Sequence, residues 1–232
     1  MNDLILCDCM DYMANCRDGE FDLCIVDPPY GIGVDGKNPI ENKSDKDHGK
    51  FQNKSHDWDD SIPTQEYFNK IIRISKGQVI WGGNYFLDYL GYCKAPVIWD
   101  KLNGGSMFAD GEMAWTGGNV PRNLKIFRHQ WCGAFKNSER GVIKIHPTQK
   151  PIALYKWLLT NYAKPGMKLF DSHSGSGSFR IAAYDMGFDL ISCELDPDYC
   201  RDNEARFQRH IQQNDLFDTK EIQKLTYKQG EL

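Results

Sequence analysis

Short apolar runs alternate with longer amphipathic stretches along most of the chain. Runs of strand length occupy residues 4–7, 21–26, 78–82, 96–99, 112–116, 124–128, 167–170 and 190–193. Apolar side chains recur at three- and four-residue spacing over residues 64–75, 152–162, 179–186 and 197–212, which predicts helices there. Asp196 is a candidate N-cap for the last helix, because Pro197 suits a first helical turn. Strands that alternate with helices predict an α/β fold with a mostly parallel, doubly wound sheet and helices on both faces.

Two segments depart from this alternation. Residues 31–62 contain many Gly, Asn, Lys, Asp and Ser residues but few apolar anchors, which predicts a mobile polar loop. Residues 101–150 are Gly-rich at first and basic afterwards. The window 121–150 carries seven basic residues and one acidic residue, whereas residues 1–30 carry one basic and seven acidic residues. This asymmetry predicts a basic patch on an acidic body, although a solvated basic face without a partner has the same pattern.

Composition narrows the class of protein. The 232 residues are 41% hydrophobic and 26% charged, which suffices for a well-packed core. The net charge of −4 excludes a polybasic protein, so any contact with nucleic acid must be local. No apolar run approaches the length of a membrane span and the first residues lack a signal-peptide pattern, so we expect a cytoplasmic protein with no membrane partner. The eight cysteines form no C-x-x-C pair, so we expect reduced thiols and no metal site.

A glycine-rich turn follows the predicted strand 167–170. The segment 171–178 reads Asp-Ser-His-Ser-Gly-Ser-Gly-Ser and opens a predicted helix. Gly175 and Gly177 let the backbone pass close to a ligand there, although a tight turn needs glycine in any case and the third glycine of a dinucleotide fingerprint is absent. Glu194 ends the next predicted strand, where a carboxylate can accept hydrogen bonds from both hydroxyls of a ribose. Together these features favour a nucleoside-containing ligand more than either does alone.

A second motif, Asp27-Pro28-Pro29-Tyr30, directly follows the apolar run 21–26. The two prolines restrict the backbone and remove two N–H donors, which leaves the Asp27 carboxylate and the Pro28 carbonyl as a rigid pair of acceptors. An acceptor pair beside the Tyr30 ring suits a planar group with an exocyclic amine. A strand exit that is merely stiffened by proline explains these residues equally well.

The motifs in this order resemble a known family. Asp27-Pro28-Pro29-Tyr30 is similar to the catalytic motif of the S-adenosylmethionine-dependent DNA amino-methyltransferases, which modify adenine N6 or cytosine N4. Residues 171–178 resemble the cofactor motif of that family, and His-Pro-Thr-Gln-Lys-Pro at 146–151 and Glu-Leu-Asp-Pro at 194–197 are further matches. The catalytic motif precedes the basic segment and the glycine motif, which is the circularly permuted order of the β group. On residues 3–210 the chain is identified as a member of this group, which implies a Rossmann-like methyltransferase fold.

The resemblance assigns roles to individual residues. It implies a catalytic motif made of Asp27, Pro28, Pro29 and Tyr30. The residues that it implies for cofactor binding are Asp8, Thr148, Lys150, Asp171, His173, Gly175, Gly177 and Glu194. A small target-recognition segment at about 101–150 is expected to contact DNA through Arg122, Lys125, Arg128, Lys136 and Arg140. Ser172 and His173 stand where the family usually has Pro-Phe, and Cys7 stands where it usually has glycine.

The resemblance also implies a reaction and its partners. Residues 1–232 form a single catalytic domain that transfers a methyl group to adenine N6 in double-stranded DNA, since Asp at the first motif position is typical of adenine enzymes. The alternatives are a cytosine N4 enzyme, a DNA-binding protein with weak catalysis, and a methyltransferase for RNA or a small amine. Cytosine C5 chemistry is excluded, because no cysteine here follows a proline. The family also admits a homodimer and a restriction-endonuclease counterpart.

The reaction constrains the order of the strands. The target amine and the donated methyl group must meet within a few ångströms, so both motifs must open at one edge of the sheet. We therefore expect the strand 167–170 to lie beside the strand 21–26 and parallel to it. Asp27 and Gly175 would then face one crevice, although about 140 residues separate them.

Overall fold

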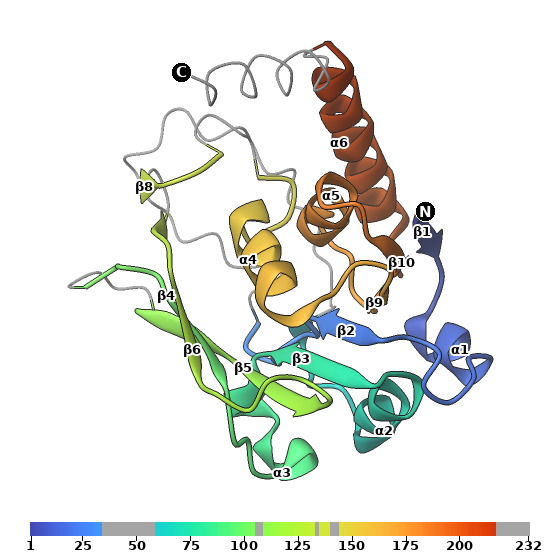
Figure 1. The fold of residues 1–232 in the computed structure, drawn as a ribbon, viewed down its shortest axis with the longest axis vertical. Coiled ribbons are helices and arrows are strands. Elements are labelled where there is room, and N and C mark those ends of the chain that lie inside the picture. Colours follow the sequence, from blue (N-terminus) through green and yellow to red (C-terminus); the bar gives the residue numbers. More distant parts are fainter. Residues whose placement is uncertain (34–58, 105–108, 133–134, 140–143, 217–232) are drawn as a thin grey trace, which may run out of the picture.

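The computed structural model describes residues 1–33, 59–104, 109–132, 135–139 and 144–216. Within these ranges eight strands form one sheet in the order β1-β10-β9-β2-β3-β5-β4-β6 (Figure 1). The strands of this sheet are β1 (Asn2–Leu6), β2 (Leu23–Val26), β3 (Gly77–Trp81), β4 (Val97–Asp100), β5 (Gly111–Gly118), β6 (Lys125–Arg128), β9 (Lys168–Asp171) and β10 (Asp189–Glu194). A separate antiparallel pair consists of β7 (Trp131–Cys132) and β8 (Phe135–Lys136).

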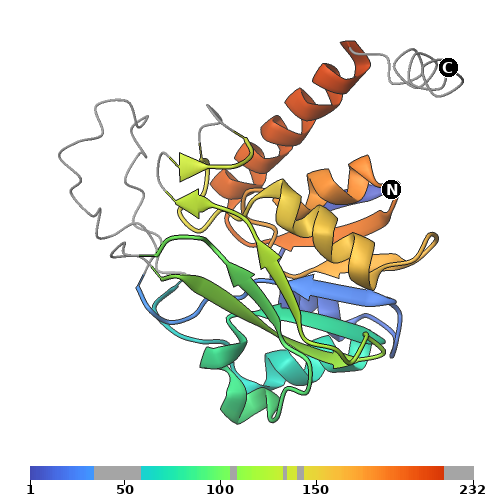
Figure 2. The same cartoon turned by 60° about the vertical axis from the view of Figure 1, so that its left-hand side comes forward.

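Helices cover both faces of the large sheet. The helices are α1 (Cys9–Ala14), α2 (Gln65–Ile74), the 3₁₀ turn η2 (Gly83–Tyr85), α3 (Leu87–Leu90), α4 (Ile152–Tyr162), α5 (Ser178–Asp185) and α6 (Pro197–Leu216). Figure 1 shows α4, α5 and α6 on one face and α1, α2 and α3 on the other, and the turned view in Figure 2 keeps this division. Strand β5 runs antiparallel to β3 and β4, whereas the other pairings in the sheet are parallel. The predicted mostly parallel α/β sheet is confirmed.

Strand β2 lies at the centre of this arrangement and is buried on both faces. Leu23 and Ile25 point into the core beneath α4 and α5, and Cys24 and Val26 point into the core beneath α1 and α2. Each of the four side chains is at most 1% exposed. A parallel strand that is covered on both faces needs apolar residues at successive positions, which explains the uninterrupted apolar run before Asp27.

The predicted elements are present, with boundaries shifted by a residue or two in most cases. Helix α4 has the predicted bounds, and Asp196 Oδ1 accepts the N–H groups of Asp198 at 2.7 Å and Tyr199 at 3.1 Å as the N-cap of α6. Helices α1 and α3 and the strands β7 and β8 were not predicted. These elements have six, four, two and two residues, which is too short for a hydrophobic period to emerge.

The predicted neighbourhood of the two motif strands is confirmed. Strand β9 pairs with β2 in parallel, with Leu169 opposite Leu23 and Phe170 opposite Cys24. Both strands therefore end at the same edge of the sheet. No helix in the described ranges is long and apolar enough to cross a membrane. Of the predicted polar loop, residues 34–58 lie outside the described residues.

Candidate active site

A cavity of about 1390 Å³ lies at the carboxyl edge of the parallel strands. Asp8 follows β1, Asp27 follows β2, His173 and Gly175 follow β9, and Glu194 ends β10; all five residues line the cavity. Open α/β sheets bind ligands at this edge, because the loops there leave a crevice between neighbouring strands. The prediction that Asp27 and Gly175 face one crevice is thus confirmed.

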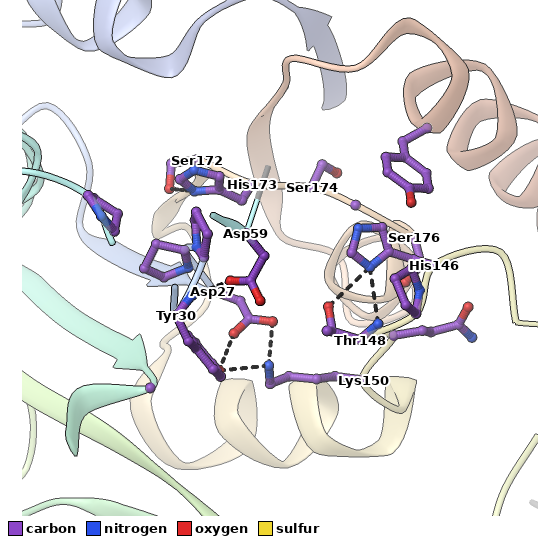
Figure 3. Close-up of a pocket in the computed structure, with 18 of the residues that line it drawn as sticks. Asp27, Tyr30, Asp59, His146, Thr148, Lys150, Ser172, His173, Ser174 and Ser176 are labelled. Atoms are coloured by element: carbon purple, nitrogen blue, oxygen red, sulfur yellow. Dashed lines mark hydrogen bonds and ion pairs between the residues drawn. The ribbon is translucent and has the colours of Figure 1, made fainter. Parts of the chain in front are cut away.

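Asp27 lies in a tight cluster with Tyr30 and Lys150 (Figure 3). The Tyr30 hydroxyl donates to Asp27 Oδ1 at 2.5 Å, and the Lys150 ammonium pairs with Oδ2. Lys150 Nζ is also 3.2 Å from the Tyr30 hydroxyl oxygen. Burial raises the pKa of Asp27, and the charge of Lys150 opposes this rise. Lys150 was expected on the cofactor side, but the structure places it against the first residue of the catalytic motif.

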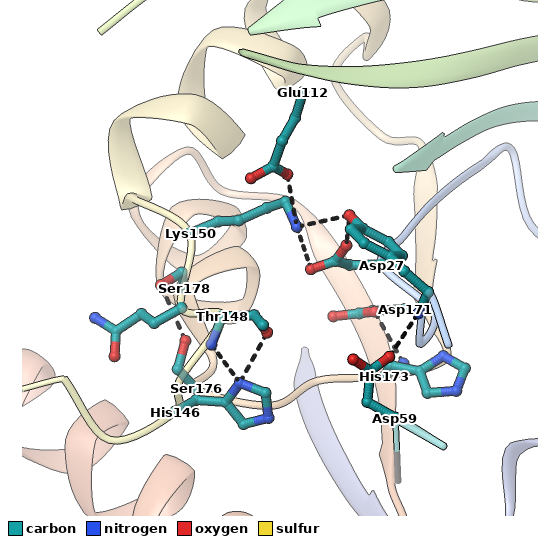
Figure 4. A network of polar contacts seen from close by, with 12 residues as sticks. Asp27, Asp59, Glu112, His146, Thr148, Lys150, Asp171, His173, Ser176 and Ser178 are labelled. Atoms are coloured by element: carbon teal, nitrogen blue, oxygen red, sulfur yellow. Dashed lines mark hydrogen bonds and ion pairs between the residues drawn. The ribbon is translucent and has the colours of Figure 1, made fainter. Parts of the chain in front are cut away.

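A second carboxylate, Glu112 on β5, extends the cluster (Figure 4). Its Oε2 lies 3.3 Å from Lys150 Nζ, and its Oε1 lies 2.5 Å from Nζ of Lys101, which directly follows β4. Burial acts to raise the pKa of Glu112, but the two ammonium groups hold it below its usual range. Four charges of alternating sign therefore run from Asp27 through Lys150 and Glu112 to Lys101 along the wall of the cavity.

The Tyr30 ring is held by residues from two other segments. Asp59 Oδ1 accepts the backbone N–H groups of Tyr30 at 2.8 Å and Gly31 at 2.9 Å, which anchors the chain after the prolines. Gly82 has a φ of +71°, and a Cβ built on it would overlap the Tyr30 ring, at 2.6 Å from Cδ1. The Tyr85 ring stacks on Tyr30 with centroids 5.1 Å apart. Sequence reasoning missed Asp59, Gly82 and Tyr85; the glycine pair directly after β3 was the available signal.

The glycine turn and Glu194 meet on the other side of the cavity. The Gly175 N–H donates to Glu194 Oε2 at 2.7 Å, and the Asp196 N–H donates to Oε1 at 3.0 Å. Burial raises the pKa of Glu194, although these backbone donors oppose the rise. Gly175 adopts a φ of +47°, which favours glycine. Glu194 is 9% exposed, so a cavity ligand can reach a carboxylate that is already oriented by two N–H groups.

Two residues expected to bind cofactor do not line the cavity. Gly177 has a φ of +74°, and a Cβ there would lie 2.7 Å from Asn203 Cγ, so this glycine allows the turn to pack against α6. Asp171 is buried beneath the turn and accepts the His173 N–H at 3.1 Å. Burial raises the pKa of Asp171 to about 8. Both residues support the shape of the turn from below.

Polar contacts connect His173 through Ser172 to Tyr67 on α2. The Ser172 hydroxyl lies 2.8 Å from His173 Nδ1 and 2.7 Å from the Tyr67 hydroxyl. Burial lowers the pKa of His173 to about 4, so the imidazole is neutral near pH 7. The serine and histidine that stand in place of Pro-Phe thus form a neutral hydrogen-bonded chain with a tyrosine of α2.

The segment 146–151 contributes to both ends of the cavity. Thr148 Oγ1 lies 3.1 Å from His146 Nδ1, and the His146 ring packs on Tyr199 with centroids 4.4 Å apart. His146 also lies next to Gly175, at 3.6 Å from the position that a Cβ would take. Thr148 therefore belongs to the side of the glycine turn, whereas Lys150, two residues later, faces Asp27 (Figure 3).

Parts of the chain match known proteins in sequence. Residues 97–205 match a family model described as DNA methylase. The chain is 23% identical over 236 residues to the Type II methyltransferase M2.MboI of Moraxella bovis, with 86% of this chain and 85% of the relative covered. It is 24% identical over 257 residues to the Type II methyltransferase M.HinfI of Haemophilus influenzae, with 92% of this chain and 70% of the relative covered. The chain is therefore similar to DNA methylases over residues 97–205 and to Type II methyltransferases over most of its length.

Solved structures of DNA methyltransferases share the fold of this chain. The M1.HpyAVI–SAM complex matches with a TM-score of 0.57 and 19% identity over 89% of this chain and 100% of that chain. The PvuII DNA methyltransferase, described as cytosine-N4-specific, matches with a TM-score of 0.56 and 14% identity over 88% of this chain and 85% of that chain. The expected Rossmann-like methyltransferase fold is confirmed.

Three of the basic residues expected to bind DNA lie at or near the edge strand β6. Arg122 and Lys125 lie at the amino end of the edge strand β6, and Arg128 lies at its carboxyl end, with Nε 3.5 Å from Asp100 Oδ2. None of these three lines the cavity. Lys136 belongs to β8, and Arg140 lies outside the described residues. Lys101 and Lys144 were not among the expected site residues, yet both line the cavity.

Proposed function

We propose that the protein transfers a methyl group from S-adenosylmethionine to the exocyclic N6 amine of adenine in double-stranded DNA. One observation supports this proposal most strongly. The Asp27 motif lines the same cavity as Gly175 in the glycine turn and Glu194 at the end of β10, and all three lie at one edge of the sheet. Asp27 and Pro28 offer acceptors for an amine, and Glu194 offers a carboxylate for the hydroxyls of a ribose. Residues 1–232 act as a single catalytic domain, and a homodimer and an endonuclease counterpart stay predictions.

The residues of the cavity fit such a cofactor. Glu194 would accept the ribose hydroxyls, and Asp8, His173 and Thr148 line the same part of the cavity. Ligand pockets usually measure about 300–1,000 Å³, so a cavity of about 1390 Å³ has room for a cofactor and a flipped nucleotide together. When bound, S-adenosylmethionine supplies a methyl group on a positively charged sulfur, which leaves with the electron pair of the broken carbon–sulfur bond.

The chain's own residues would orient the amine for this displacement. The lone pair of an exocyclic amine is delocalised into the base, so the amine is a poor nucleophile. Hydrogen bonds from the amine to Asp27 and to the Pro28 carbonyl favour the pyramidal form in which the lone pair is available, which stabilises the transition state. One proton then leaves the methylated nitrogen, so Asp27 need not be a strong base. Flipping the base out of the duplex costs roughly a few kcal/mol, and contact with the Tyr30 ring offsets part of it.

The choice of adenine rests on the first residue of the motif. Asp27 occupies a position where cytosine N4 enzymes usually carry serine, which favours adenine. The decisive experiment is nucleoside mass spectrometry of DNA incubated with the protein and S-adenosylmethionine, with RNA of the same sequence as a parallel substrate. We expect N6-methyladenine in the DNA arm. N4-methylcytosine would overturn the adenine assignment but keep the family, and methylation confined to RNA would overturn the substrate class.

A first prediction concerns Glu194. Replacing Glu194 with Ala removes the carboxylate that would hold the ribose, and hydrogen bonds to a charged group contribute about 1.5–3 kcal/mol each. We expect the Kd for S-adenosylmethionine, measured by calorimetry, to rise about tenfold to a hundredfold. Glu194→Gln keeps one acceptor oxygen and should show an intermediate loss. Glu66→Ala removes an exposed carboxylate on α2 and should leave the affinity unchanged; an equal affinity for Glu194→Ala would refute the ribose assignment.

A second prediction concerns the DNA surface. Each basic residue that neutralises a phosphate of duplex DNA contributes about 0.9 to the slope of log affinity against log salt concentration. Replacing Arg122 and Arg128 together should flatten this slope by up to about two units if both contact phosphates. Replacing the exposed Arg201 of α6, which pairs with Asp198 and Asp202, should leave the slope unchanged. An unchanged slope for the double variant would show that Arg122 and Arg128 do not contact phosphates, and would favour a DNA site near Lys101 and Lys144 beside the cavity.

A further inference from the structure

Lys150 has no role yet in the proposed reaction, although it lies in the middle of the four alternating charges. Lys150, which precedes α4, lies between the carboxylates of Asp27 and Glu112, which come from the end of β2 and the start of β5 (Figure 4). Its side chain is only 4% exposed. A buried ammonium group is stable only when carboxylates and hydrogen-bond acceptors surround it, so its position here is determined by these neighbours.

We propose that Lys150, held in place by Glu112, is a positioning residue that orients the Asp27 carboxylate and keeps it ready to accept the target amine. This inference rests on the proposed methyl transfer. An ammonium group has three N–H donors, and three acceptors surround this one: Asp27 Oδ2, the Tyr30 hydroxyl at 3.2 Å and Glu112 Oε2 at 3.3 Å. Lys150 thus makes two hydrogen bonds and one further ion pair, and its position restrains the Asp27 carboxylate.

Charge gives Lys150 a second effect on the same carboxylate. Titratable groups that face Asp27 come from several elements, namely Tyr30 after β2, Glu112 on β5, Lys150 before α4, Tyr155 on α4 and Asp171 on β9. Lys150 is the cation among these groups. Burial favours the protonated form of Asp27, and a protonated carboxyl donates a hydrogen bond where the amine needs an acceptor. Lys150 opposes that protonation.

Glu112 acts on Asp27 through Lys150 and in the opposite electrostatic sense. Its own negative charge raises the pKa of Asp27, whereas its ion pair holds Lys150 in place. Lys101 holds the second oxygen of Glu112 at 2.5 Å, so Glu112 is restrained from both sides. Removing the charge of Lys150 and removing the charge of Glu112 should therefore shift the proton affinity of Asp27 in opposite directions. A merely structural role for these residues would not produce opposite shifts.

The experiment titrates the Asp27 carboxyl by ¹³C NMR in the protein without substrate, with Asp27→Asn to assign the signal. We expect Lys150→Met to raise the midpoint by about one pH unit or more, which is a tenfold or larger change in proton affinity. Glu112→Gln should lower the midpoint, and Lys150→Arg should restore it toward the wild type. Lys156→Met is the matched control, because Lys156 lies on α4 but pairs with Asp185 away from the cavity. Equal midpoints in all variants would overturn the inference.

Kinetics then test the consequence for the reaction. A higher pKa of Asp27 means that its ionised form is lost at a higher pH, so the acidic limb of the kcat profile should move upward in Lys150→Met and downward in Glu112→Gln. The Kd for S-adenosylmethionine should stay within about twofold. A large loss of cofactor affinity with an unmoved pH profile would assign Lys150 to the cofactor instead. If Lys150→Met does not fold, the downward shift in Glu112→Gln, which preserves the shape of the side chain, decides alone.

The two proposals can fail separately. Wild-type protein that methylates no DNA or RNA would overturn the proposed function, whereas the NMR titration of Asp27 needs no turnover. Conversely, the wild-type protein could be active while the midpoint of Asp27 is the same in the Lys150 and Glu112 variants. That result would support methyl transfer but overturn the positioning role of Lys150.

Discussion

Replacing Asp27 with Asn is expected to lower kcat for methyl transfer by about a hundredfold to a thousandfold, the range found when one preorganised transition-state contact is removed. The amide keeps nearly the same shape but loses the negative charge, and its NH₂ group faces the amine with donors in place of acceptors. Asp27→Ala removes both oxygens and should abolish turnover. Single-turnover transfer of labelled methyl groups to DNA measures both effects.

Cofactor affinity separates this effect from general damage. Asp27 contacts Tyr30 and Lys150, whereas the ribose carboxylate Glu194 lies on the side of the glycine turn. Calorimetry should therefore give a Kd for S-adenosylmethionine within about twofold of the wild type. Asp18→Asn is the matched control, because Asp18 is an exposed surface carboxylate that pairs with Arg73. Turnover above a tenth of the wild-type rate in Asp27→Asn would exclude Asp27 from the reaction.

Replacing Gly82 with Ala should reduce kcat on the order of a hundredfold, although Gly82 carries no functional group. The added Cβ would overlap the Tyr30 ring, so the ring must move. Tyr30 donates to Asp27 Oδ1, so a displaced ring also disturbs the acceptor of the target amine. A misplacement of about 1 Å in a catalytic group can cost about a hundredfold in rate. The rate of methyl transfer at saturating DNA and cofactor measures this effect.

Gly187→Ala is a matched control for the backbone strain in this variant. Gly82 and Gly187 have φ values of +71° and +73°, but a Cβ on Gly187 meets nothing within 4 Å. Both variants should therefore lose about 1 kcal/mol or somewhat more of stability, as measured by denaturant unfolding. Only Gly82→Ala should lose catalysis. Equal rates in the two variants would show that the position of the Tyr30 ring does not limit the reaction.

Local patterns account for the parts of the fold that the sequence determines by itself. Helix α4 begins and ends where the apolar spacing predicts, and Asp196 caps α6 as its position before Pro197 indicates. Strand β2 is identifiable because a strand buried on both faces needs an unbroken apolar run. The motifs at residues 27–30 and 171–178 were recognisable for a similar reason, because the functional residues of each are close together in the sequence after a strand. These features depend on residues within one or two turns of each other.

The direction and the partners of the strands were decided by tertiary structure. Strand β5 contains an ordinary apolar pattern, and nothing in that pattern states that it runs antiparallel to β3 and β4. Side-chain alternation is the same in parallel and antiparallel strands, so periodicity cannot distinguish them. The short elements α1, α3, β7 and β8 depend on their packing, because fewer than two turns or three residues contain no period to detect.

The functional roles of several residues also required the tertiary structure. Lys150 and Asp27 are 123 residues apart in sequence, and Asp59 and Tyr30 are 29 apart, so no local spacing links them. Gly177 looks like a ligand-binding glycine but serves contact with Asn203. The longer elements and the two chemical motifs can thus be identified from the sequence, because they depend on neighbouring residues. Which charges surround Asp27 was decided by the sheet order, which brings β2, β5 and the start of α4 to one cavity.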